Sequence, residues 1–124
     1  MADQDTTTAS GRRAEQLATD CLRARGYELT QRNYRCKLGE IDIVARDGDV
    51  LCFIEVRSRR SASRGHPLET VDRRKQARII RAAEHYLATQ QAGDCAVRFD
   101  VVAILFEPEL DVQLVQGAFE AQWY

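Results

Sequence analysis

The sequence lacks long apolar runs, the cysteine spacing of a zinc site, and internal repeats. No stretch approaches eighteen consecutive apolar residues, so we expect no membrane-spanning helix. The first ten residues are polar and acidic, which argues against a secretory signal, and residues 1–10 are expected to form a disordered tail. The four cysteines show no C-x-x-C spacing, which disfavours zinc and favours a reducing, cytoplasmic location. Residues 11–124 are therefore expected to form one soluble domain.

The net charge of −1 conceals an uneven distribution along the chain. Residues 57–81 carry nine Lys and Arg against only Glu69 and Asp72, whereas residues 82–124 carry one Arg against seven acids. A basic stretch is usually a solvated face. Beside a carboxylate cluster it is also typical of a site that handles phosphodiesters, because basic groups neutralise backbone phosphates and acids hold a cation.

Apolar periodicity predicts two helices and five strands in the order α-β-β-β-α-β-β. The helices are expected over 11–25 and about 69–90, and the strands over 27–35, 40–46, 49–57, 97–106 and 110–115. A helix between strands of one sheet predicts an α/β domain with a mixed sheet and helices on its faces. Residues 58–67 are rich in Arg and Ser and are expected to form a mobile basic loop.

Two neighbouring strands carry acidic side chains within apolar runs. Asp47-Gly48 predicts a two-residue hairpin loop, which would place Asp42 opposite Phe53 and Glu40 opposite Glu55. In that register Asp42, Glu55 and Arg57 share one face, together with Val44, Leu51 and Phe53. The other face is entirely apolar and consists of Ile41, Ile43, Ala45, Val50, Cys52, Ile54 and Val56.

The acidic face of this hairpin predicts a divalent-metal site. Carboxylates held close together repel one another unless a proton or a cation lies between them. The apolar residues on the same face predict that another element covers it. Two simpler interpretations stay open: a half-exposed polar face of an antiparallel sheet, or a salt bridge from Glu55 to Arg57 or Arg59.

The element order and these residues resemble the restriction-endonuclease-like fold and its PD-(D/E)xK pattern, with Glu55-Val56-Arg57 as the second motif. The similarity is closest to the YraN-like family, bacterial proteins grouped with endonucleases and related in fold to archaeal Holliday-junction resolvases. It covers nearly all of the chain from Gly11 onward. It rests on Ala14-Glu15, Gly26-Tyr27, Arg32-Asn33-Tyr34-Arg35, Gly39-Glu40-Ile41-Asp42-Ile43-Val44, Phe53-Ile54-Glu55-Val56-Arg57-Ser58-Arg59, Lys75 and Arg98-Phe99-Asp100-Val101-Val102.

The resemblance implies a metal-dependent endonuclease that cleaves DNA. Mg²⁺ or Mn²⁺ would be bound by Asp42, Glu55 and the main-chain carbonyl of Val56, an oxygen set that suits these ions. Glu15 would reach the site through water or a second metal.

The basic residues near this site would act on the phosphate. Arg57 or Lys75 would stabilise the charge of the transition state, and Arg59, Arg60 and Arg64 would bind the DNA backbone. For Lys75 an ordinary solvated position is an equal alternative. The superfamily's usual motif lysine is Arg57 here, and an arginine cannot act as a general base.

Two functions are therefore left open by the sequence. One is an endonuclease acting on branched or repair intermediates, for which a two-fold homodimer would supply two sites. The other is a nucleic-acid-binding module of the same fold in which catalysis is impaired. His66 and His85 are expected to be structural. Asp100 is expected to pair with Arg98 or a helix arginine, with a role in the site as the alternative.

Overall fold

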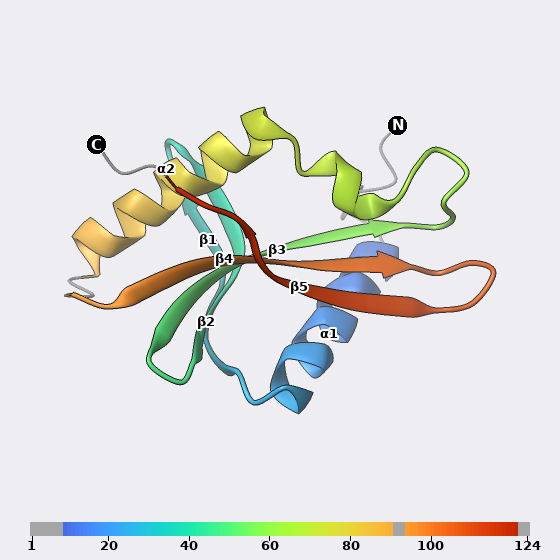
Figure 1. The fold of residues 1–124 in the computed structure, drawn as a ribbon, viewed down its shortest axis with the longest axis horizontal. Coiled ribbons are helices and arrows are strands. Elements are labelled where there is room, and N and C mark those ends of the chain that lie inside the picture. Colours follow the sequence, from blue (N-terminus) through green and yellow to red (C-terminus); the bar gives the residue numbers. More distant parts are fainter. Residues whose placement is uncertain (1–8, 91–93, 122–124) are drawn as a thin grey trace.

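The computed structural model describes residues 9–90 and 94–121, which form a five-stranded sheet between two helices (Figure 1). The element order confirms the α-β-β-β-α-β-β prediction. The elements are α1 (Ala9–Ala24), β1 (Glu28–Cys36), β2 (Gly39–Asp47), β3 (Val50–Arg59), the 3₁₀ helix η1 (Pro67–Thr70), α2 (Arg73–Thr89), β4 (Ala96–Leu105) and β5 (Asp111–Phe119). Residues 1–8 of the predicted tail lie outside the described residues, and α1 begins at Ala9, earlier than expected.

The sheet is mixed, as predicted, and its strands are ordered β1-β2-β3-β4-β5. Neighbouring strands are antiparallel except for β3 and β4, which are parallel. Parallel strands need a crossover connection, and the chain supplies it through η1 and α2. Figure 1 shows α1 and α2 on opposite sides of the sheet.

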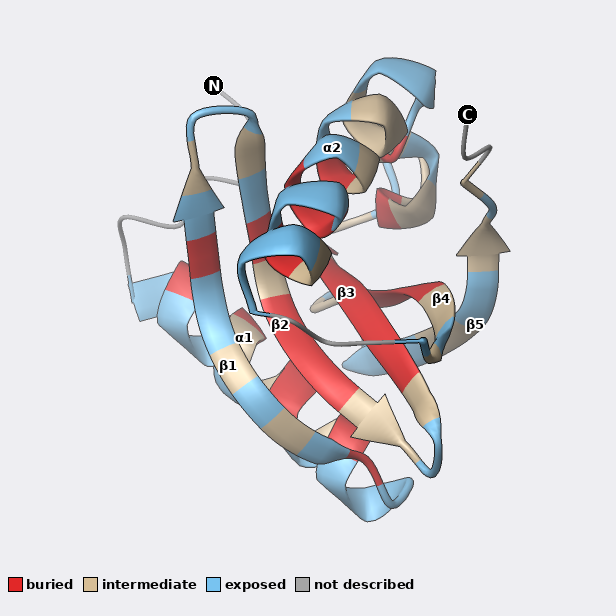
Figure 2. Cartoon of the chain, turned by 90° about the vertical axis from the view of Figure 1, so that its left-hand side faces the viewer, coloured by how far each residue is buried: buried red, intermediate tan, exposed pale blue. Residues whose placement is uncertain are grey.

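Each face of the sheet packs against one helix. The α2 side contains Val44, Leu51 and Phe53, which confirms that another element covers the acidic face of the hairpin. The α1 side contains Ile43, Cys52, Ile54 and Val56. Figure 2 shows the resulting band of buried residues along β2 and β3 beneath α2. The interpretation of this face as half-exposed is therefore wrong.

Among the described residues, no helix has the length and apolar character that crossing a bilayer requires. All four cysteines are free. Cys52 is fully buried, as expected for a small core residue, whereas Cys21 is only half-buried.

The second helix begins at Arg73, not at Glu69 as predicted. Residues 67–70 instead form η1, whose first turn is capped by the His66 ring as it accepts a hydrogen bond from the Leu68 amide. Asp72 then adopts an extended backbone conformation, and its side chain accepts from the Lys75 amide as the N-cap of α2. The expected structural role of His66 is confirmed.

The hairpin register differs from the prediction by two residues. The loop consists of Gly48 and Asp49, so Asp47 pairs with Val50 and Val44 pairs with Phe53. Gly48 has φ +61° at the first loop position, as in a type II′ turn. The expected pairing of Asp42 with Phe53 is therefore wrong. A shift of two residues preserves the faces, so the predicted grouping of Asp42 with Glu55 is unaffected.

The alternation of side chains breaks at Asp42. Ile41 packs in the α2-side cluster, whereas Ile43, two residues later, packs on the α1 side. Backbone pairing between β2 and β3 ends at Ile43. Beyond it, the Asp42 side chain accepts a hydrogen bond from the Val56 amide at 2.8 Å. The prediction that Ile41 shares a face with Ile43 is therefore wrong. In β1, Asn33 lies between the partners of Ile41 and Ile43 and has φ +53°.

Candidate active site

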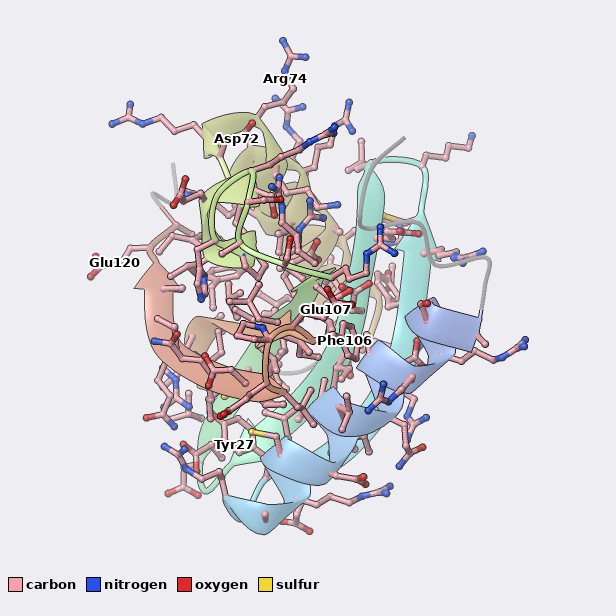
Figure 3. The ribbon with its side chains drawn as sticks, turned by 90° about the vertical axis from the view of Figure 1, so that its right-hand side faces the viewer. Tyr27, Asp72, Arg74, Phe106, Glu107 and Glu120 are labelled. Atoms are coloured by element: carbon pink, nitrogen blue, oxygen red, sulfur yellow. The ribbon has the colours of Figure 1, made fainter. Side chains whose placement is uncertain are left out.

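Four predicted residues come together where the β2–β3 ladder ends beneath the first turn of α2. Asp42 comes from β2, Glu55 and Arg57 from β3, and Lys75 from α2. Lys75 is the third residue of its helix, and the Asp72 cap fixes its backbone. Figure 3 marks this end of α2 by Asp72, while Arg74 extends outward from the molecule. Lys75 thus contacts Glu55, and the alternative of an ordinary solvated position is wrong.

Glu55 is the buried centre of this cluster, with 3% of its surface exposed. Its Oε2 atom lies 3.3 Å from Lys75 Nζ and 3.3 Å from Arg57 Nη1. A buried carboxylate requires such partners, because desolvation of an unpaired charge is costly. The predicted salt bridge to Arg57 therefore exists. It forms part of a larger arrangement in which two cations and a second acid surround one carboxylate.

Asp42 is the second acid, and its pKa is raised well above the ordinary value. Burial is the largest cause, followed by the charge of Glu55 and a hydrogen bond between the two carboxyl groups. The Val56 amide and Lys75 act in the opposite direction and lower this pKa. The two acids thus face one another, which is the geometry predicted for a metal-binding pair, and the charge of Glu55 disfavours ionisation of Asp42.

Asp42→Asn should raise the melting temperature in metal-free buffer at neutral pH by roughly 3–5 °C. The asparagine oxygen can still accept from the Val56 amide, while the charge that repels Glu55 is removed. Because the folded pKa lies above the unfolded one, the unfolded chain loses its proton first, from about pH 4 upward, and folding stability falls as pH rises. Melting curves at pH 4 and pH 7 test this: the gain should shrink at the lower pH. An equal gain at both values would contradict it.

Arg57 is held in place by a residue that the sequence did not indicate. Its Nε atom donates to Thr70 Oγ1 at 2.6 Å, and that hydroxyl donates in turn to the Pro67 carbonyl at 2.6 Å. The 3₁₀ helix therefore aims the guanidinium at Glu55. Pro67, a residue favoured at the start of a helix, was the available signal for this turn.

Glu15 does not join the carboxylate pair as predicted. It forms an ion pair with Arg32 of β1 at 3.7 Å and lines a separate depression of about 450 Å³ with Arg12 and Asn33. In the described part of the chain, no group of three or more His, Cys, Asp or Glu residues could hold a metal ion. Any cation here would depend on Asp42, Glu55 and main-chain oxygen.

The three arginines predicted to bind DNA differ in their surroundings. Arg59 Nη1 donates to the Arg64 carbonyl at 2.7 Å, which closes the loop after β3. The carbonyls of Arg59 and Arg60 accept from the amides of Phe106 and Glu107. The segment expected to be mobile is thus tied to the end of β4. Arg60 and Arg64 themselves are exposed and available to a solvent-borne anion.

Asp100 has the structural role that was expected. It is fully buried and accepts from Arg98 Nε at 2.8 Å, the Tyr27 hydroxyl at 2.7 Å and the Gly117 amide at 2.9 Å. Arg98 also reaches Asp47 at 2.8 Å. Burial raises the pKa of Tyr27 to about 12, so the phenol remains a donor at neutral pH. In Figure 3 Tyr27 lies at the end of the molecule away from Asp72.

His85 likewise makes a side-chain contact within the fold, with the hydroxyl of Tyr34, which is buried in the α2-side cluster. His85 therefore has the structural role that was expected, because it contacts a buried residue of the core.

Comparison with known proteins places these residues within a bacterial family. Residues 14–104 match uncharacterised protein family UPF0102. The chain belongs to this family. A UPF0102 protein of Nitrosococcus oceani is 47% identical over 114 residues, which cover 90% of this chain and 92% of the relative. One from Caldicellulosiruptor saccharolyticus is 41% identical over 112 residues (88% and 95%), and one from Chlorobaculum parvum 52% over 95 residues (77% and 74%).

The UPF0102 match includes every predicted site residue, from Glu15 to Lys75. The motifs on which the expected family resemblance rests, from Ala14-Glu15 to Val101-Val102, lie within the matched residues. The names of the relatives state the family and no activity.

Proposed function

We propose that this UPF0102 protein is a cytoplasmic, metal-dependent endonuclease that hydrolyses DNA phosphodiesters, with branched or repair intermediates as substrates. The observation that carries the proposal is the pair of half-buried Asp42 and buried Glu55, with Lys75 and Arg57 both placed on Glu55. Two acids beside two cations suit a reaction in which a cation and a phosphate must be bound together. The element order and the Glu55-Val56-Arg57 motif support placement in the restriction-endonuclease-like superfamily.

The residues present fit Mg²⁺ or Mn²⁺. Asp42 and Glu55 supply hard carboxylate oxygens. Burial and, after it, the charge of Glu55 raise the pKa of Asp42, and a dication between the two carboxylates would relieve their repulsion. The main-chain amide of Val56 faces Asp42, and in an extended strand the carbonyl of the same residue lies on the same side. Mg²⁺ retains several waters, so it does not require a third acidic side chain. When bound, such an ion lowers the pKa of a coordinated water and polarises the phosphate.

The two cations have different roles in this proposal. Arg57 is fixed by Thr70 and carries a permanent, planar charge, which suits it to bind a phosphate oxygen as negative charge develops there. Lys75 lies in the first turn of α2. Its ammonium can leave Glu55 and bind a phosphate once another cation neutralises the Glu55 carboxylate. Arg60, Arg64 and Arg74 are exposed nearby and would hold the flanking backbone.

A second candidate is a nucleic-acid-binding module in which catalysis is impaired. The Glu15–Arg32 ion pair favours it, because the third acid of the expected site is engaged elsewhere. Arg57 favours it as well, since arginine cannot take a proton from water. Both candidates share the same nucleic-acid surface, and they differ only in the fate of the substrate.

Cleavage assays separate the two candidates. The parent protein and Arg57→Lys should be incubated with single-stranded, nicked, flapped and four-way-junction DNA, with Mn²⁺ or with EDTA. The endonuclease proposal predicts cleavage of at least one branched substrate by the parent with Mn²⁺ and none with EDTA. Faster cleavage by Arg57→Lys would show that arginine is tolerated and suboptimal. If neither protein cuts any substrate while both bind DNA, the binding module is the better account.

A further inference from the structure

A groove of about 510 Å³ lies between the β1–β2 turn and α2, directly beside the carboxylate pair. Lys75 belongs to both places, since it lines the groove and lies 3.3 Å from Glu55. Three further cationic side chains line the groove: Arg35, Lys37 and Arg78. Glu40 is the single acid among the lining residues, and its oxygen lies 3.3 Å from Arg35. The groove therefore carries an excess of positive charge and suits a polyanion.

An exposed apolar side chain stands at the rim of this groove. Leu38, in the turn between β1 and β2, is 52% exposed. The other large apolar side chain exposed among the described residues is Leu110, at 46%. Leu110 follows Glu109 and precedes Asp111, so it sits among acids, whereas Leu38 follows Lys37 and lines the basic groove. Of the two, only Leu38 is placed to meet a nucleic acid.

The turn that carries Leu38 is packed closely against the backbone of α2. A Cβ atom added at Gly39 would lie 2.9 Å from the Arg78 carbonyl oxygen, so only glycine permits this approach. The groove is thus bounded on one side by a turn whose position is set by backbone-to-backbone contact. Leu38 is consequently presented at a defined distance from Lys75, and little ordering is required when a ligand binds.

We propose that this groove receives an unpaired segment of nucleic acid next to a duplex, with Leu38 packing against an unstacked base. The proposal rests on the proposed nucleic-acid function and specifies its substrate: DNA with a single-stranded arm or a branch. Lys37, Lys75 and Arg78 take the phosphates, and the strand leads from Leu38 to the Asp42–Glu55 pair. Cleavage would then fall close to the junction of paired and unpaired DNA.

The chemistry of Leu38 decides in favour of an unpaired base. A leucine side chain makes no favourable contact with a phosphate or with water. Its contact is favourable when it covers the face of a base or enters a base step. In a continuous duplex both faces of each base are stacked, and opening a step costs several kcal/mol. At a fork or flap that cost is already removed. The cationic residues do not discriminate in this way, because phosphates are present in every substrate.

The test compares Leu38→Ala with Leu110→Ala, a matched control that shortens the other exposed leucine. Binding is measured by fluorescence anisotropy in EDTA, which prevents cleavage, on a forked DNA and on a continuous duplex of equal length. A second fork carries 2-aminopurine as the unpaired base nearest the branch, so that its fluorescence reports stacking on that base. Both positions are exposed, and circular dichroism confirms that each variant is folded.

We expect Leu38→Ala to weaken fork binding about five- to tenfold, to leave duplex binding within about twofold, and to remove most of the 2-aminopurine response, because less apolar surface is then buried against the base. Leu110→Ala should match the parent in all three measurements. If the parent binds forks but Leu38→Ala and Leu110→Ala behave alike, the Leu38 proposal is overturned and the proposed function stands. If the parent binds neither DNA, both are overturned. An equal loss on fork and duplex would also overturn it, because Leu38 would then not be reading an unpaired base.

Discussion

Asp42→Asn should reduce metal-dependent cleavage by roughly a thousandfold or more. The catalytic ion contributes several kcal/mol of transition-state stabilisation, and the amide removes the charge that would bind it. The shape of the side chain and the bond from the Val56 amide are retained. DNA binding should persist or strengthen, because one negative charge near the phosphate is gone. The measurements are the initial rate of cleavage with Mn²⁺ and the affinity for the same DNA in EDTA.

The matched control for this variant is Asp49→Asn. It removes the same charge from the same hairpin, but at the exposed loop instead of at the pair with Glu55. It should leave both the cleavage rate and the affinity within about twofold of the parent, because a surface charge beyond a Debye length is largely screened. An Asp42→Asn protein that cleaves at the parent rate would show that Asp42 is not part of the reaction.

Asp100→Asn should cost about 3–5 kcal/mol of folding free energy. Asp100 is completely buried, and its two oxygens accept from Arg98, Tyr27 and Gly117. An asparagine would place an N–H group against donors, and it would remove the charge that compensates the Arg98 guanidinium. Urea denaturation measures the loss.

The two acids that interrupt apolar strands should therefore respond in opposite ways. In metal-free buffer at neutral pH, Asp42→Asn stabilises the protein and Asp100→Asn destabilises it, because Asp42 faces another acid and Asp100 faces a cation. The cleavage rate per folded molecule should be unchanged in Asp100→Asn. A loss of less than about 1 kcal/mol would contradict the structural role given to Asp100.

The sequence predicted the faces of the hairpin better than its register. Period-two alternation groups Asp42 with Glu55 whether the loop is Asp47-Gly48 or Gly48-Asp49, because the two registers differ by an even number of residues. The observed register is accompanied by a hydrogen bond from Arg98 to Asp47, which joins residues 51 positions apart. Turn rules that consider only neighbouring residues cannot predict such a contact. Ile41 was misplaced for a similar reason, since the strand irregularity at Asp42 depends on the partner strand.

The composition of the site was predicted only in part. The two acids, Arg57 and Lys75 could be named because their residue types and spacing match a known motif and because α2 is the next α-helix after β3. Glu15 was misassigned because a helical wheel places it on a face but does not reveal that Arg32 is its partner. Thr70 was missed because its role depends on the 3₁₀ turn, which forms only where the His66 and Asp72 caps stop the longer helix.

The central claim is that Asp42 and Glu55 form a divalent-cation site, and a Mn²⁺ titration followed by thermal melting tests it most directly. For the parent, a hundredfold excess of Mn²⁺ over its Kd should stabilise the fold by about 2.7 kcal/mol. Asp42→Asn should begin with the higher melting temperature and show little further shift, so the order of the two proteins should reverse as Mn²⁺ is added. Parallel responses of the two proteins, or no shift in the parent at millimolar Mn²⁺, would contradict the claim.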